Sequence, residues 1–281
     1  MILVTGAAGK TGLALIKSLT ADGLDARAMI HRPEREKQVR SAGATEIQIG
    51  DMENRSDMAI AFKGVERVYF IVPNVHPNEI EIGKTAIAEA KKAGTQHFVY
   101  HSVLFPQIED MPHHWRKLRV EEALIQSGLA FSILQPANYM QNILAYWKSI
   151  ETEGLIRLPY SVEALSSPVD LLDVAEVATK ILSSEAHIGA SYDLAGPQKL
   201  SFAQMAAQIG SHLAKDVQAK EIALQDWQSS VRAEGLDEER LQTLSQMFSY
   251  YEDHHFAGNP QALTQLLGRQ PSTFADFLAG M

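Results

Sequence analysis

The chain has 281 residues, and at about 150 residues per domain this length predicts roughly two domains. Lys and Arg number 25 and Asp and Glu number 34, so the formal net charge is −9. Nucleic-acid surfaces and polybasic membrane anchors both depend on clustered Lys and Arg, and this acidic balance argues against both. Hydrophobic residues make up 46% of the chain, which is enough for a buried core and excludes disorder throughout. There is no cysteine, so disulfides, zinc–thiolate sites, iron–sulfur clusters and cysteine nucleophiles are excluded.

The amino terminus carries no charged segment ahead of a long apolar run. The apolar residues 2–4 are followed almost at once by glycine, so we expect no signal peptide. Apolar stretches elsewhere fall short of the ~20 residues needed to cross a bilayer. We therefore expect a cytoplasmic protein with no membrane partner.

The first half of the chain alternates between two periodicities, a pattern that is typical of βαβ units and a parallel sheet. Short apolar runs predict strands at 2–5, 26–30, 46–49, 65–72, 97–101 and 130–134. Helical spacing predicts helices at 13–21, 34–42, 58–62, 79–93 and 115–127. Helix stops are expected at Gly23, Gly43, Gly64, Gly94 and Gly128. The sequence therefore predicts an α/β fold with a doubly wound parallel Rossmann sheet.

After Pro136 the pattern changes to a smaller, mostly helical lobe. Asp173 is expected to cap a helix that runs through residue 183, and Ser201 to cap a helix over 202–213. A last helix should begin at Asn259-Pro260 and end at Gly268. Further predicted segments are helical spacing at 139–150, extended pieces at 155–158, 166–170 and 191–194, and polar helices up to about 251. We predict a Rossmann domain over 1–135 and a C-terminal substrate lobe over 136–281, with segments near 166–194 returning to the sheet.

Three glycines between the first strand and the first helix carry the clearest functional signal. They follow the spacing Gly6-x-x-Gly9-x-x-Gly12, a variant of the dinucleotide fingerprint. Glycine is needed there because the turn is tight, the backbone must approach a pyrophosphate, and the helix must pack closely on the strand. The helix amides then point at the phosphates. The expected cofactor contacts are Gly6, Ala8, Gly9, Lys10, Thr11 and Gly12. The P-loop spacing is not matched.

The end of the second strand favours NADP over NAD. An NAD site usually places Asp or Glu there for the ribose hydroxyls, whereas an NADP site supplies Arg for the 2′-phosphate. This chain has His31 and Arg32 and no acid in that position. Arg32 can pair with a phosphate in bidentate fashion, and Lys10 adds a second cation nearby. A surface role for Arg32 is the alternative.

The motifs taken together resemble the NmrA-like atypical short-chain dehydrogenases/reductases. They are the glycine triplet, Arg32-Pro33, Gly50-Asp51, residues 64–68, Trp115-Arg116-Lys117 with Glu121, residues 127–129, Gln135-Pro136-Ala137 with Gln141-Asn142, and residues 267–269. The similarity spans nearly the whole chain, and none of these motifs is specific to a substrate.

The resemblance implies an NADP(H)-binding Rossmann domain with a small lobe closing over a cleft. Members of the family include NADPH-dependent quinone reductases, dye reductases, enzymes acting on phenylpropanoids and catalytically silent NADP sensors. By the same resemblance, Asp51 and Met52 would flank the adenine, and Ile71, Val72 and Pro73 would line the ribose. Pro136, Asn138 and Met140 would approach the nicotinamide.

The Tyr-x-x-x-Lys motif that supplies the catalytic groups of ordinary short-chain dehydrogenases is incomplete in this chain. His113 and Lys117 are four residues apart and so share a helix face, but no tyrosine stands there. We expect Lys117 to contact the cofactor, with a surface ion pair to Glu121 as the alternative. His113 could donate a proton or be a solvent-exposed residue. Ser102 ends a strand where such sheets expose ligand groups, and could bind substrate or only cap the strand.

Two functions remain open on the sequence. The first is an NADPH-dependent oxidoreductase that transfers hydride to a small hydrophobic quinone, carbonyl or enone, with Tyr139, Met140 and Trp147 as candidate substrate contacts. The second is a non-catalytic NADP(H) sensor that binds a regulatory protein partner, which the missing tyrosine motivates. A homodimer is also open. No metal site is expected, because His254-His255 lacks ligand spacing.

Overall fold

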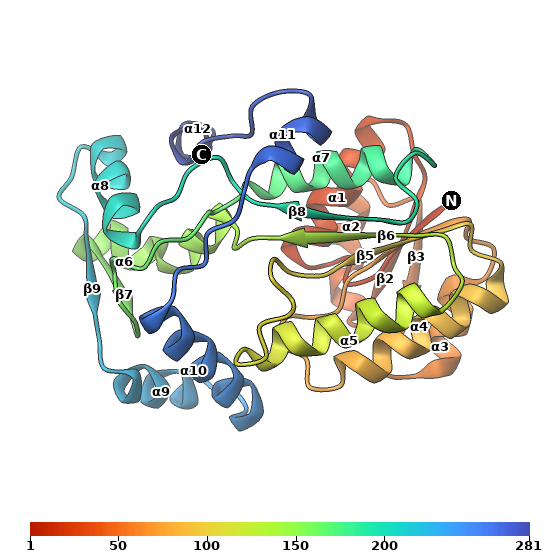
Figure 1. The fold of residues 1–281 in the computed structure, drawn as a ribbon, viewed down its shortest axis with the longest axis horizontal. Coiled ribbons are helices and arrows are strands. Elements are labelled where there is room, and N and C mark those ends of the chain that lie inside the picture. The colour runs from red at the N-terminus through yellow and green to blue at the C-terminus, as the bar shows by residue number, and fades with distance from the viewer. The chain divides into compact units, whose positions relative to one another are not determined.

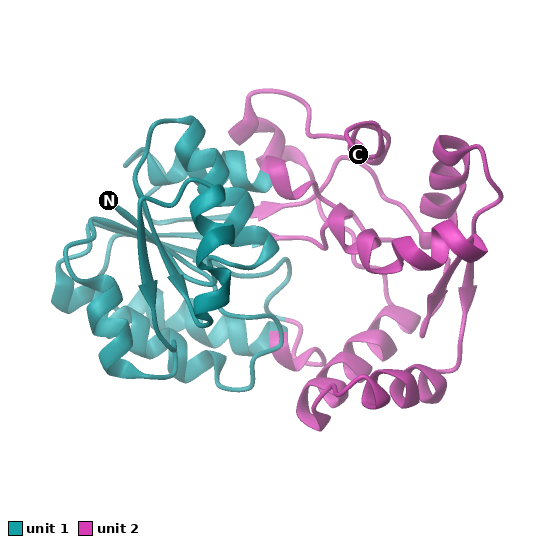
Figure 2. Ribbon diagram, turned by 180° about the vertical axis from the view of Figure 1, so that it is seen from behind, with its two compact units in different colours: residues 1–107, 114–135, 174–192 teal, residues 108–113, 136–173, 193–281 magenta.

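The computed structural model describes residues 1–281, and the chain divides into two compact units (Figure 2). Unit 1 comprises Met1–Gln107, His114–Gln135 and Val174–Tyr192. Unit 2 comprises Ile108–His113, Pro136–Asp173 and Asp193–Met281. Neither unit is therefore one continuous stretch of chain.

Unit 1 is built on a seven-stranded sheet in the order β3-β2-β1-β4-β5-β6-β8 (Figure 1). The strands are β1 (Ile2–Val4), β2 (Ala26–Ile30), β3 (Glu46–Ile49), β4 (Arg67–Phe70), β5 (His97–His101), β6 (Phe131–Pro136) and β8 (Ala190–Leu194). Neighbouring strands from β3 to β6 pair in parallel. The strand order reverses between β1 and β4, so their carboxyl ends form the switch point at which such sheets bind ligands. The predicted doubly wound α/β fold is confirmed.

Helices cover both faces of this sheet (Figure 1). They are α1 (Lys10–Ala21), α2 (Glu36–Ser41), α3 (Arg55–Phe62), α4 (Glu79–Ala93), α5 (Pro112–Gln126), α7 (Leu171–Leu182) and the short 3-10 helix η1 (Pro33–Arg35). Helices α3, α4 and α5 share a core with the strands, in which Phe70, Phe98 and Tyr100 are fully buried. Gly83 lets α4 approach α5, because a Cβ there would lie 2.7 Å from the methyl groups of Val120.

Unit 2 combines short helices with a two-stranded parallel sheet of β7 (Leu155–Leu158) and β9 (Gln218–Glu221). Its helices are η2 (Met140–Tyr146), α6 (Trp147–Glu153), α8 (Phe202–Leu213), α9 (Leu224–Ala233), α10 (Glu238–Asp253), α11 (Gln261–Leu267) and α12 (Phe274–Ala279). The core includes Ile156, Ile209 and Phe274. Ser201 caps α8 in a capping box with Gln204, as predicted.

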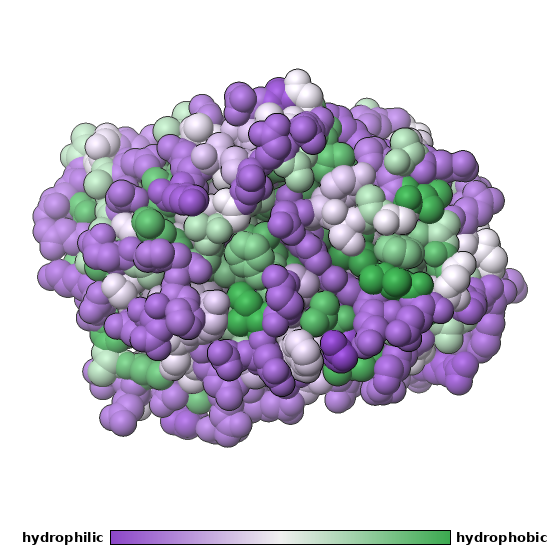
Figure 3. Space-filling model, in the orientation of Figure 1, coloured by the Kyte–Doolittle hydropathy of each residue, from purple (hydrophilic) through white to green (hydrophobic).

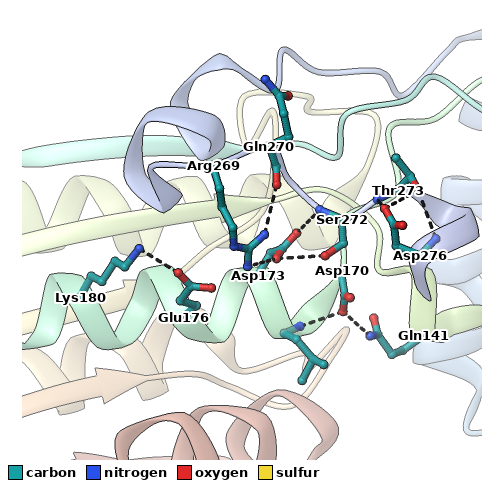
Figure 4. Close-up of polar contacts among 11 residues, drawn as sticks. Gln141, Asp170, Asp173, Glu176, Lys180, Arg269, Gln270, Ser272, Thr273 and Asp276 are labelled. Atoms are coloured by element: carbon teal, nitrogen blue, oxygen red, sulfur yellow. Dashed lines mark hydrogen bonds and ion pairs between the residues drawn. The ribbon is translucent and has the colours of Figure 1, made fainter. Parts of the chain in front are cut away.

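Three predictions for this half of the chain need correction. Asp173 does not cap α7; the carboxylate of Asp170 accepts a hydrogen bond from the amide of Leu172 at 2.9 Å instead (Figure 4). Asp173 is buried and accepts from Arg269 at 2.8 Å and from the amide of Ser272 at 2.7 Å. Strand β9 was not predicted, and α11 is not the last helix, because α12 follows it.

The visible face of the molecule is covered mainly by hydrophilic residues, with apolar ones in small separate patches (Figure 3). Large apolar side chains that are exposed, such as Ile60 and Leu172, are few. None of the helices combines the length and the apolar character needed to cross a bilayer.

Candidate functional site

The glycine loop leads from β1 into an open amino terminus of α1. Gly9 is the N-cap residue and supplies no side-chain hydrogen bond to the helix, and the first turn contains no acidic residue. The first amides of a helix have no partner within it, and they carry the positive end of the helix dipole. This end of α1 therefore offers backbone donors and positive potential to an anion, as a pyrophosphate site requires.

Two of the three glycines are required by the backbone geometry. A Cβ at Gly12 would lie 2.6 Å from both Cα of Ala7 and the carbonyl oxygen of Gly6, so no side chain fits where α1 packs on the loop. Gly6 has φ +55°, and a Cβ there would lie 3.0 Å from a methyl group of Ile71. Both constraints match the reasons for which the sequence motif predicted glycine.

Thr5 fastens this loop to the segment that follows β4. Its buried hydroxyl donates to the carbonyl oxygen of Ile71 and accepts from the amide of Ile71, both at 2.8 Å. Ile71 and the exposed Pro73 lie at the carboxyl edge of the sheet beside the loop, while Val72 is buried in the core. Val75 in the same segment has φ +51°, a strained conformation for a β-branched residue, of the kind that clusters at ligand sites.

The residues predicted to select the nucleotide lie on the loops after β2 and β3. Arg32 is exposed, and its guanidinium makes no hydrogen bond or ion pair with the protein. His31 lies 3.9 Å from the carboxylate of Asp51, and both side chains are exposed. Met52 packs against the core of unit 1. An arginine side chain without a protein partner, at a strand end that carries no Asp or Glu, suits a phosphate group.

A buried ion pair joins α5 to α4 inside unit 1. Nζ of Lys117 lies 2.5 Å from Oε1 of Glu79, and the two side chains are 8% and 0% exposed. The hydroxyl of Tyr100 donates to the same oxygen at 3.1 Å, while Oε2 of Glu79 is buried without a partner. The alternative of a surface pair between Lys117 and Glu121 is therefore wrong, because both residues are buried and have other partners.

Glu121 lies one turn further along α5 and forms a second polar group with β5 and β6. Its carboxylate accepts from the hydroxyl of Ser102. Its two oxygens also accept from the side-chain amide of Gln135, at 2.9 and 3.0 Å. Ser102 is 2% exposed. Sequence reasoning singled out Ser102 and Lys117. It missed Glu79 and Tyr100 beside Lys117, and it missed Gln135 as a partner of Glu121.

Three histidines near these groups are buried rather than exposed. His113, at the start of α5, is 5% exposed, so the alternative of a solvent-exposed residue is wrong. Burial, together with the charge of Lys117, lowers the pKa of His101 to about 3, and its ring contacts the hydroxyl of Tyr69. Burial lowers the pKa of His114 to about 4, and its Nδ1 lies 3.1 Å from the carbonyl oxygen of Phe105. His101 and His114 are therefore neutral at pH 7.

Five further residues were predicted to approach the nicotinamide or the substrate, and all of them belong to unit 2: Pro136, Asn138, Tyr139, Met140 and Trp147. Pro136 and Met140 are buried, and Met140 belongs to the core of this unit. The amide nitrogen of Asn138 donates to Ser166 at 3.3 Å, and its oxygen is buried without a partner. Trp147 donates to Glu151 at 3.0 Å, and Tyr139 is half-buried. No three His, Asp or Glu side chains are grouped to hold a metal ion.

Comparison with known proteins gives this arrangement a context. The model of the NmrA-like family matches residues 1–278. An NAD(P)H azoreductase of Xenophilus azovorans is 27% identical over 278 residues, which cover 99% of this chain and 96% of that protein. A (4-alkanoyl-5-oxo-2,5-dihydrofuran-3-yl)methyl phosphate reductase of Streptomyces griseus is 31% identical over 227 residues, 80% of this chain and 78% of that protein. The Escherichia coli NADPH-dependent quinone oxidoreductase, solved with NADPH, has the same fold, with a TM-score of 0.84 at 22% identity over 100% of this chain and 99% of that one.

Proposed function

The chain belongs to the NmrA-like family, and from that premise we propose that it is an NADPH-dependent oxidoreductase acting on small hydrophobic acceptors. The observation that carries the proposal is the amino terminus of α1, which has no side-chain cap. Gly12, in the first turn of this helix, allows it to pack closely on the loop, because a Cβ there would collide with the loop. The similar azoreductase, furanone phosphate reductase and quinone oxidoreductase support it, since their names denote reduction of conjugated acceptors. A quinone, carbonyl or enone acceptor fits this chemistry.

The protein has groups that would suit both the adenine end and the nicotinamide end of the cofactor. Backbone amides after Gly9 would bind the pyrophosphate, with Lys10 beside them. The free guanidinium of Arg32 would bind the 2′-phosphate, with Asp51 and Met52 near the adenine. The unpartnered buried oxygen of Asn138 is an acceptor that the NH₂ group of a carboxamide would satisfy.

When bound, NADPH supplies the hydride, and the protein must orient the acceptor and provide a proton. We assign to Lys117 the contact with the nicotinamide ribose, where the carboxylate of Glu79 would hold its ammonium group in place. Ser102 would bind the acceptor or the nicotinamide, with Glu121 accepting from its hydroxyl. His113 is the candidate proton donor, because the tyrosine of ordinary short-chain dehydrogenases is absent from α5.

The test is NADPH oxidation, followed at 340 nm, against a panel of quinones, azo dyes, enones and carbonyl compounds. We expect turnover with at least one class, and a Kd for NADPH below that for NADH. Tight NADPH binding without turnover across the whole panel would instead favour the NADP(H) sensor. Recovery of a protein partner that depends on NADP(H) would then support that alternative.

A further inference from the structure

The amino edge of the parallel sheet, opposite the edge that carries the glycine loop, has a polar group that the proposed function does not use. Arg67 begins β4, His97 begins β5, and Ser132 lies near the start of β6. Arg67 pairs with His97 in the sheet, and Ser132 pairs with Val99, two residues further along β5. The side chains of Arg67, His97 and Ser132 therefore lie on the same face of the sheet, and all three residues belong to unit 1 (Figure 2).

Three hydrogen bonds fasten the loop between α7 and β8 to this edge. The guanidinium of Arg67 donates to the last carbonyl oxygen of α7. The hydroxyl of Ser132 donates to the carbonyl oxygen of His187 at 2.6 Å, and the amide of Gly189 donates to that of Phe131 at 2.7 Å. No residue of the loop is buried, so these bonds hold it rather than apolar packing. We call the three bonds, together with the ring of His97, the amino-edge latch.

His97 has a defined proton position within the latch. Its Nε2 lies 2.9 Å from the hydroxyl oxygen of Ser132, and both side chains are buried. A serine hydroxyl has one proton, and Ser132 donates it to His187. The Nε2 of His97 is therefore the donor in its bond to Ser132, and Nδ1 of the neutral ring carries no proton. This Nδ1 is buried without a partner.

A second proton on His97 would find no acceptor while the loop is in place. It would bind to Nδ1, where no hydrogen-bond partner lies. Burial lowers the pKa of His97 to about 4, and the charges of Arg67 on β4 and His187 in the loop act in the same direction. No carboxylate offsets them. Nδ1 of His187 in turn lies 3.0 Å from the hydroxyl of Tyr192 on β8.

We propose that the amino-edge latch is an acid-sensitive switch, in which protonation of His97 releases the loop between α7 and β8 from the sheet while the strands of unit 1 stay folded. The loop is suited to such local opening, because it buries no side chain of its own. The proposal requires neither cofactor binding nor turnover, and therefore stands apart from the proposed reductase function.

The direction of the pH effect follows from the two states of His97. Released into water, the ring has its ordinary pKa of about 6.5, whereas in the closed latch the pKa is about 4. Above pH 6.5 neither state binds the second proton, and the latch stays closed. As the pH falls from 6.5 towards 4, only the open state binds it, so opening becomes more favourable. Between pH 7.5 and 5 the ratio of open to closed loops should rise about 30-fold.

The test is hydrogen–deuterium exchange of the full chain at pH 7.5 and 5, with rates corrected for the intrinsic pH dependence of amide exchange. We expect the protection of residues 183–190, which include the amide of Gly189, to fall about 30-fold at pH 5. Residues 1–21 should stay protected at both pH values over the labelling times in which the loop exchanges.

Three variants separate the titration of His97 from the rest of the protein. His97→Gln keeps an amide donor for Ser132 but cannot be protonated, so the loss of loop protection at pH 5 should shrink to less than about threefold. Ser132→Ala removes the central bond of the latch, and should lower loop protection several-fold already at pH 7.5. His212→Gln, exposed on α8 of unit 2, is the matched control and should behave as the unaltered protein.

The proposal is overturned if corrected loop protection is the same at both pH values, or falls as far in His97→Gln as in the unaltered protein. Loss of protection at equal rates in the loop and in residues 1–21 would also overturn it, because that result means global unfolding. A loop that is as well protected in Ser132→Ala at pH 7.5 as in the unaltered protein would show that the latch does not hold it. Thermal melting at pH 7.5 verifies that each variant is folded.

Discussion

The ammonium of Lys117 and the carboxylate of Glu79 form an ion pair at 2.5 Å that is almost entirely shielded from water. Removing one charge of a buried pair leaves the other without compensation, which costs about 3–5 kcal/mol. We expect Glu79→Ala and Lys117→Ala each to lower the free energy of unfolding by that order. The double variant should lose less than the sum of the two. Denaturant titrations of the four proteins measure the coupling, and strict additivity would contradict the buried pair.

Little in the sequence could have identified that pair. Glu79 and Lys117 are 38 residues apart in the chain and meet only because α4 and α5 pack closely at Gly83 and Val120. An acid in the first turn of a helix is normally explained by the helix dipole. The spacing of Lys117 and Glu121 left a surface pair open as the alternative, since local pattern contains no information on burial.

Where local rules determine the structure, prediction succeeded. The strands at 26–30, 46–49 and 97–101 and the helix at 79–93 have the predicted bounds, because apolar periodicity and end signals agree there. Strand β9 was missed, since Gln218–Glu221 is mostly exposed and pairs only with β7. Asp173 looked like a cap because an acid preceded apolar residues, but its carboxylate binds Arg269 from 96 residues away.

Arg32 should determine the preference between the two nicotinamide cofactors. A charge-assisted contact with the 2′-phosphate contributes about 1.5–3 kcal/mol. We expect Arg32→Ala to raise the Kd of NADPH by about 10- to 100-fold and to leave that of NADH within about twofold. Arg35→Ala removes a nearby exposed arginine, whose guanidinium bonds Gln38, and is the matched control. Equal losses for both cofactors would show that Arg32 does not read the 2′-phosphate.

Gly12→Ala should block cofactor binding through sterics alone. The added methyl group would lie 2.6 Å from Cα of Ala7, so either α1 or the loop must move, at a cost of about 1–3 kcal/mol. We expect a lower melting temperature and a Kd for NADPH raised at least tenfold. Gly280→Ala is the control, since a Cβ there meets nothing nearer than 3.6 Å. Unchanged NADPH binding in Gly12→Ala would place the pyrophosphate elsewhere.

Stability should fall as the pH drops from about 6.5 towards 4. Burial lowers the pKa values of His97 and His114 to about 4, so these rings are neutral in the folded protein when the unfolded chain already binds protons. The contribution of these two neutral rings to the free energy of unfolding is complete above pH 6.5. It is lost as the pH falls towards their folded-state pKa values. The slope is at most about 1.4 kcal/mol per pH unit for each histidine.

Urea titrations at pH 7.5, 6 and 5 measure this loss. We expect His97→Gln to flatten the dependence and the exposed His212→Gln to leave it as it is. A wild-type free energy of unfolding that does not change between pH 7.5 and 5 would rule out buried neutral histidines as a source of acid sensitivity.

The division of the chain into two discontinuous units has a consequence for biosynthesis. Unit 1 is complete only with Val174–Tyr192, which the ribosome delivers after Pro136–Asp173 of unit 2. A nascent chain that ends near residue 136 has β6 at an open edge of its sheet, without β8, and lacks α7 beside α1. The nucleotide-binding half therefore reaches its finished form only when about two thirds of the protein has been synthesised.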